Sequence, residues 1–81
     1  MKTINIQEAI LKDLQDRYKK AVLNKTELAN ELNVSVSSIN NYISKGYAIP
    51  QYIKLGNARN ARVVFPIVHV AAYLSETILV R

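Results

Sequence analysis

Two short helical patterns, joined by a three-residue polar break, organise the middle of the chain. Their apolar positions lie one, three or four residues apart, as on one face of a helix, and comprise Leu28, Ala29 and Leu32, then Val36, Ile39, Tyr42 and Ile43. Asn33 can end the first helix because asparagine enters the left-handed backbone region at low cost, and Ser35 can cap the second. So short a turn makes the two helices cross steeply, so residues 24–46 predict a helix-turn-helix.

A longer amphipathic pattern precedes this unit and predicts an N-terminal helix over residues 4–23. Apolar side chains recur at every fourth position, at Ile6, Ile10, Leu14, Tyr18 and Val22. Asn5 is the expected N-cap, and Glu8 can complete a capping box. The apolar stripe can pack on its own domain, or residues 4–23 can form the contact of a homodimer or a cooperative array.

Residues 47–65 change from helical to strand-like character. Pro50 excludes a helix there, and two β-prone runs, 52–55 and 62–65, flank a polar loop. This pattern predicts a hairpin, or wing, and residues 66–79 then return to helical spacing, with Pro66 in the first turn. The expected fold class is mostly α with a small β-hairpin. In full, it is a winged helix-turn-helix with an extra N-terminal helix, in one domain spanning residues 1–81.

The predicted second helix of the helix-turn-helix has an unusual outward face. Its short polar side chains are Ser37, Ser38, Asn40, Asn41 and Ser44, and none of them is acidic. Serine and asparagine are poor helix formers, so an ordinary solvated face would favour Glu, Lys, Gln or Arg. Hydroxyls and amides bond base edges and phosphates, and an asparagine amide can bond both N6 and N7 of adenine. These residues are therefore candidate DNA-binding residues, with an ordinary solvated face as the alternative.

The net charge of +5 is concentrated in the second half of the chain. The basic residues after position 40 are Lys45, Lys54, Arg59, Arg62 and Arg81, against the single acid Glu76. Such an excess downstream of a helix-turn-helix is typical of a polyanion partner, here double-stranded DNA. Arginines on a projecting wing can reach phosphate or a narrow minor groove, and a loop that only adds solubility is the alternative. The candidate DNA-binding residues outside the predicted helix face are Lys45, Asn57, Arg59, Asn60 and Arg62.

Composition argues against several other classes. The chain has no cysteine, one histidine and two glycines, so it lacks a phosphate-cradling glycine loop, a nucleophile with its base and a metal-ligand cluster. We therefore expect no enzyme activity, no cofactor and no metal, and we assign no chemistry to His69. The apolar stretch 63–80 is interrupted by Pro66 and His69, and the chain begins without a secretory pattern. The expected location is the cytoplasm, without membrane insertion.

The central motif also resembles a known family. The residues that carry the resemblance are Lys25, Thr26, Glu27, Leu28, Ala29, Leu32, Val34, Ser35, Ile39, Tyr42, Ile43 and Gly46. They are similar to the helix-turn-helix core of the excisionase and AlpA group, relatives of the MerR family. The resemblance covers residues 22–75, with Asn33 where the motif often has glycine. Residues 1–21 lie outside it.

The resemblance implies a winged helix-turn-helix that binds double-stranded DNA selectively. The implied role is that of an excisionase-like recombination directionality factor, or of a small transcriptional regulator of a phage or other mobile element. The alternative is a protein–protein adaptor, or a phage packaging or regulatory subunit that uses the same helices as a scaffold.

Overall fold

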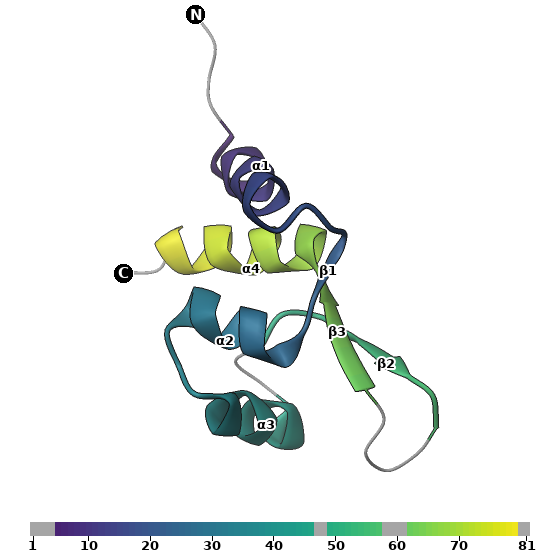
Figure 1. Ribbon diagram of the computed structural model, residues 1–81. Helices are drawn as coiled ribbons and strands as arrows, with labels where there is room; N and C mark the ends of the chain where they lie inside the picture. The colour runs from purple at the N-terminus through teal and green to yellow at the C-terminus, as the bar shows by residue number, and fades with distance from the viewer. Residues whose placement is uncertain (1–4, 47–48, 58–61, 80–81) are drawn as a thin grey trace, which may run out of the picture.

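The computed structural model describes residues 5–46, 49–57 and 62–79 of the chain. This part is mostly helical, with a three-stranded antiparallel sheet in the order β1-β3-β2 (Figure 1). The elements in chain order are α1 (Ile6–Tyr18), β1 (Val22–Leu23), α2 (Lys25–Leu32), α3 (Val36–Lys45), β2 (Ile53–Leu55), β3 (Arg62–Pro66) and α4 (Ile67–Leu79). The predicted combination of helices with a small amount of β structure is confirmed.

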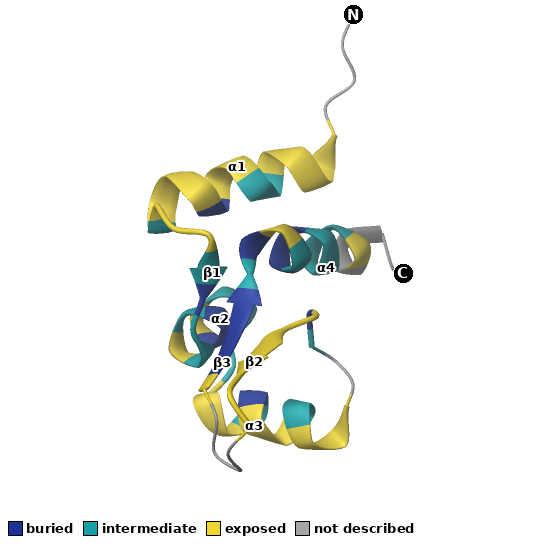
Figure 2. Ribbon diagram, turned by 90° about the vertical axis from the view of Figure 1, so that its right-hand side faces the viewer, coloured by how far each residue is buried: buried dark blue, intermediate teal, exposed yellow. Residues whose placement is uncertain are grey.

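α1 and α3 lie at opposite ends of the molecule, with α4 and α2 between them (Figure 1). α1 packs across α4 at one end, α2 packs on α3, β1 and β3, and α3 forms the opposite end (Figure 1). The turned view shows β3 running through the middle with its residues mostly buried, while α1 and α3 expose one side each (Figure 2). β3 begins on the side of the end formed by α3 and runs toward α4 (Figures 1 and 2).

The core draws one large side chain from almost every element. The fully buried ones are Leu14 from α1, Leu23 from β1, Leu28 from α2, Ile39 from α3, Phe65 from β3 and Val70 from α4. Burying a side chain of this size stabilises a fold by about 1.5 to 3 kcal/mol. Because these residues come from all four helices, the core fixes the position of α3 relative to the rest of the chain.

The N-terminal helix is shorter than the predicted 4–23. It ends at Tyr18, because Lys19 adopts a left-handed conformation with φ of 57°. Val22 and Leu23 then pair with Pro66 and Phe65 as strand β1, and Ala21 accepts a hydrogen bond of 2.9 Å from the backbone N–H of Ile67. Val22 lies four residues after Tyr18 and so extends the apolar spacing, but it belongs to a strand and not to the helix. The prediction of helix over residues 19–23 was therefore wrong.

The apolar stripe of α1 faces its own domain. Leu14 is fully buried, and Ile10, Leu11 and Tyr18 are partly buried against the core. Ile6, at 43% exposure, is the large apolar residue of α1 that remains exposed in the described structure. Packing on α4 therefore accounts for most of the stripe, and a homodimer contact through residues 4–23 stays a prediction.

The predicted turn residues between α2 and α3, Asn33 and Ser35, are confirmed, and the structure adds a capping box at the start of α2. Asn24 and Glu27 form a capping box at the start of α2, with reciprocal bonds of 2.8 and 2.9 Å. Asn33 ends α2 in a left-handed conformation, with φ of 58°, and Ser35 caps α3 by accepting from the N–H of Ser38. Gly46, with φ of 78°, ends α3.

Val36, Pro66 and the residues of the hairpin loop differ from their predicted positions or lie outside the described residues. Val36 was expected on the apolar side of α3 but is 38% exposed, because it lies in the first turn whereas the helix meets the core at Ile39. Pro66 is the last residue of β3, so α4 begins one residue later than predicted. The hairpin strands pair as predicted, with Ile53 opposite Val64, but Arg59 and Asn60 lie outside the described residues. No helix within the described ranges has both the length and the apolar character needed to cross a membrane.

The left-handed conformation at Asn33 allows a direct test of the turn between α2 and α3. Asn33→Ala should lower the free energy of unfolding by about 1 kcal/mol, because a Cβ without a compensating polar group is disfavoured there, whereas Asn33→Gly should change it by less than about 0.5 kcal/mol. Urea denaturation measures both variants. Asn30→Ala, the same substitution on the exposed face of α2, is the control and should be neutral or stabilising. Equal losses at positions 30 and 33 would contradict this account of the turn.

Candidate nucleic-acid interface

One exposed stripe runs along α3. Ser37, Asn40, Asn41 and Ser44 lie three or four residues apart and are all exposed, while Ile39 on the other side of the helix is fully buried. Lys45 is exposed at the end of the helix. The structure thus brings these five candidate residues together on one surface, which we call the α3 stripe.

Ser38 does not belong to this stripe. It is half-buried, and its Oγ atom accepts a hydrogen bond of 3.1 Å from the Oγ atom of Ser35. Its backbone N–H also donates to the same Ser35 atom. Ser38 is therefore less exposed than the other polar residues of α3, because its hydroxyl bonds to the residue that caps the helix, and its part in DNA binding stays a prediction.

Asn40 has a partner that sequence reasoning missed. The Nζ atom of Lys25, at the first position of α2, donates a hydrogen bond of 2.7 Å to Oδ1 of Asn40. The two residues are 15 positions apart, so only the steep crossing of α2 and α3 could have suggested the contact. Asn41, one residue further, shows no side-chain hydrogen bond within the described part of the chain.

The β2–β3 hairpin adds basic groups at the same end of the molecule. Lys54 on β2 and Arg62 on β3 are exposed, as is Asn57 just beyond β2. Both views place Leu55 and Arg62, the facing ends of β2 and β3, toward the end of the molecule formed by α3 and away from α1 (Figures 1 and 2). The sequence between residues 32 and 75 contains no Asp or Glu, so this end of the chain is free of carboxylate side chains across both elements.

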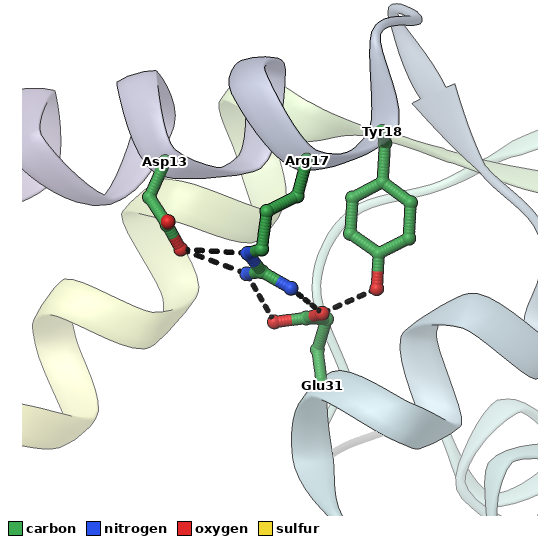
Figure 3. Close-up of polar contacts among 4 residues, drawn as sticks. All are labelled: Asp13, Arg17, Tyr18 and Glu31. Carbon is green, nitrogen blue, oxygen red and sulfur yellow. Dashed lines mark hydrogen bonds and ion pairs between the residues drawn. The ribbon is translucent and has the colours of Figure 1, made fainter.

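The two carboxylates of α2 are paired with cations of α1 and of the loop after it. Arg17 of α1 donates from Nη1 and Nη2 to Glu31 of α2, at 2.7 and 2.9 Å, and from Nε to Asp13 at 2.9 Å (Figure 3). The hydroxyl of Tyr18 also donates to Glu31. Closer to the start of α2, Lys20 and Glu27 form an ion pair of 2.7 Å. The negative charges of α2 are thus neutralised on the side that faces α1.

These contacts change the proton affinities of the groups involved. The hydrogen bond from Arg17 lowers the pKa of Glu31 and outweighs the opposing effect of burial. Burial alone raises the pKa of Glu27, but Lys20 and the backbone N–H of Asn24 together bring it below its ordinary value. For Tyr18, burial and the bond to Glu31 raise the pKa. Both α2 carboxylates therefore stay ionised and paired at neutral pH.

The structure supports the sequence predictions unevenly. Among the described residues, no group of three His, Cys, Asp or Glu side chains could hold a metal ion. The α3 stripe and Arg62 were found from local patterns, whereas Lys25 and the Arg17–Glu31 pair were not. Comparisons with protein-family models, with characterised proteins and with solved structures find no match for this chain.

The Arg17–Glu31 pair makes stability depend on pH in a defined direction. Since the pKa of Glu31 is lowered by folding, the unfolded chain binds more protons between the two pKa values, and stability falls as pH drops below about 4.5. Glu31→Gln should lower the free energy of unfolding by about 1 to 2 kcal/mol at pH 7. It should also make the fall of stability with decreasing pH less steep. Thermal denaturation across pH 3 to 7 measures both effects.

The control for this test is Glu76→Gln. Glu76 is an exposed carboxylate on α4, and its substitution should change the unfolding free energy at pH 7 by less than about 0.5 kcal/mol. If the stability of Glu31→Gln fell at low pH as steeply as that of the unsubstituted protein, the assignment of the pair would be contradicted.

Proposed function

We propose that this protein binds double-stranded DNA selectively as a winged helix-turn-helix, with α2 and α3 as the helix-turn-helix and the β2–β3 hairpin as the wing. The observation that carries the proposal is the α3 stripe, which is exposed, rich in amides and hydroxyls, and free of carboxylates. The helix α3 has ten residues and is therefore about 15 Å long. The major groove of B-DNA is about 12 Å wide and admits an α-helix. The stripe would face the base edges.

Affinity and selectivity would come from different residues. Lys45 and Lys54, together with Arg62 on the wing, are exposed cations that can neutralise phosphates, which gives binding without sequence preference. The predicted tip residues Arg59 and Asn60 would add to this clamp. The amides and hydroxyls of the α3 stripe would supply base contacts, since these groups match the donor and acceptor pattern of the major groove.

The paired carboxylates of α2 support the same orientation on DNA. A carboxylate facing the phosphate backbone would repel it at short range, and α2 is the element next to α3. Glu27 and Glu31 instead bond to Lys20 and Arg17. α1 and the loop after it thus act as a charge-neutralising layer on the side of α2 away from the proposed DNA.

The resemblance to the excisionase and AlpA group suggests the biological setting. A small protein of this kind would act in the cytoplasm on a phage or other mobile element, either directing recombination or regulating transcription. Several copies could bind side by side, with residues 4–23 as their contact.

A protein–protein adaptor is the second candidate, favoured by one surface feature. A groove of about 610 Å³ lies between the end of α1 and the sheet, with an apolar lining that includes Val22, Ile53, Pro66, Ile67 and Val68. Ile53 and Val68 are about half exposed, at 49% and 50%. An adaptor would use this groove, because Leu14, a candidate partner contact on α1, is buried in the core.

Fluorescence anisotropy with a labelled mixed-sequence duplex, at several salt concentrations, tests the proposal. The logarithm of the affinity should fall with that of the salt concentration with a slope that corresponds to about three or more neutralised phosphates. Arg62→Ala should weaken binding to all sequences and reduce the slope by about 1. Lys12→Ala, which removes an exposed cation of α1 at the other end of the molecule, is the matched control and should have little effect. Absence of binding at low salt would refute the proposal and direct attention to the apolar groove.

Asn41→Ala tests selectivity separately from affinity. Selection of bound sequences from a randomised duplex pool should yield a defined site for the unsubstituted protein. The variant should lose preference at one base pair, by about 1 to 3 kcal/mol, because a bidentate amide contact is removed. Its salt slope should be unchanged. A selected site identical to that of the unsubstituted protein would exclude Asn41 from base contact.

A further inference from the structure

We propose that Lys25 is a positioning residue that changes the base preference of Asn40 from adenine to guanine. This inference rests on the proposed function and names the base that one residue of the α3 stripe would select. It begins with the contact of 2.7 Å between Nζ of Lys25 and Oδ1 of Asn40.

The contact determines how the amide of Asn40 is turned. A lysine ammonium has three donors and no acceptor, so the atom of Asn40 that it approaches is the carbonyl oxygen. The amide NH2 group therefore points away from Lys25. Asn40 is exposed, so its NH2 group remains accessible to a ligand on the α3 stripe.

Lys25 is available for this role because the neighbouring carboxylates bond elsewhere. Glu27 pairs with Lys20, and Glu31 pairs with Arg17. Lys25 is half-buried at the start of α2, and its side-chain hydrogen bond within the described structure goes to Asn40. The ammonium thus adds a positive charge next to the amide oxygen without a carboxylate to offset it.

The base preference follows from the donors and acceptors of the pair. Adenine shows an acceptor at N7 and a donor at N6 in the major groove, whereas guanine shows acceptors at N7 and O6. An unengaged asparagine offers one donor and one acceptor and matches adenine. With Lys25 on its oxygen, Asn40 offers its NH2 group beside an ammonium. The positive charge of Lys25 disfavours approach of the adenine N6 amino group to the remaining lone pair of Asn40 Oδ1. The NH2 group of Asn40 and the ammonium of Lys25 are both donors, and both match the acceptors of guanine.

Asn41 provides an internal comparison on the same helix. Its side chain shows no hydrogen bond among the described residues, so its amide keeps both a donor and an acceptor. Two adjacent asparagines would then select different bases because only one of them is engaged by a lysine.

Selection of bound sequences from a randomised duplex pool tests the inference. The base pair whose preference is lost in Asn40→Ala identifies the position that Asn40 contacts. There the unsubstituted protein should favour guanine over adenine by about tenfold, and Lys25→Met, which keeps most of the side-chain length but no charge, should lower this ratio by at least tenfold. The preference at the base pair assigned by Asn41→Ala should not change.

Two further variants separate positioning from general effects. Lys25→Arg retains a cationic donor and should keep the guanine preference. Lys45→Met also removes one positive charge from this surface, so it should weaken binding at all sites without altering the base selected. Thermal denaturation of each variant confirms that it is folded before selection.

The outcomes distinguish this inference from the proposed function. Guanine preference that persists in Lys25→Met, adenine preference in the unsubstituted protein, or no position that depends on Asn40 would overturn the role of Lys25 while DNA binding stands. Absence of DNA binding by the unsubstituted protein would overturn the proposed function, and the inference with it.

Discussion

Antiparallel pairing of β3 on both of its edges is the constraint on which the rest of the structure depends. β1 pairs with one edge and β2 with the other, so backbone hydrogen bonds join the hairpin to a segment from a much earlier part of the chain. Phe65 of β3 is fully buried, and its ring lies 5.8 Å from the ring of Tyr52, centroid to centroid. The strand therefore fixes the base of the hairpin to the same core that receives Ile39 from α3. α3 and the base of the hairpin are thus both anchored in one core.

Charge is divided between the two ends of the molecule by the same packing. The carboxylates of α2 lie where the Arg17 and Lys20 side chains can reach them, and Glu31 is only 13% exposed. A salt bridge of this kind adds little net stability if both partners are exposed, but a partly buried carboxylate that lost its guanidinium would be costly. The pair therefore holds α1 in place and removes free negative charge from the element that supports α3. This arrangement gives α1 an electrostatic role in addition to covering α4.

The α3 stripe illustrates how tertiary contacts change the meaning of a residue type. Three of the polar residues predicted to face outward have different environments: Ser38 bonds to the helix cap, Asn40 bonds to Lys25, and Asn41 has no side-chain partner among the described residues. The hydroxyl of Ser38 therefore takes part in the fold, the amide of Asn40 presents mainly its donors, and the amide of Asn41 presents both a donor and an acceptor. Composition of a helix face indicates that a polar ligand fits there, whereas the individual contacts decide which groups are available to it.

The sequence by itself determined the features whose partners lie within a few residues. The left-handed residue Asn33 and the cap at Ser35 depend on backbone groups at most four positions away, so their residue types predict them. The exposed side of α3 follows from the 3.6-residue period in the same way. Strand β1 could not be recognised, because two residues are too few for a pattern and Val22 pairs with Pro66, 44 positions later. The contacts of Lys25 with Asn40 and of Arg17 with Glu31 likewise join side chains 15 and 14 positions apart, and only the packing of the helices brings them within hydrogen-bonding distance.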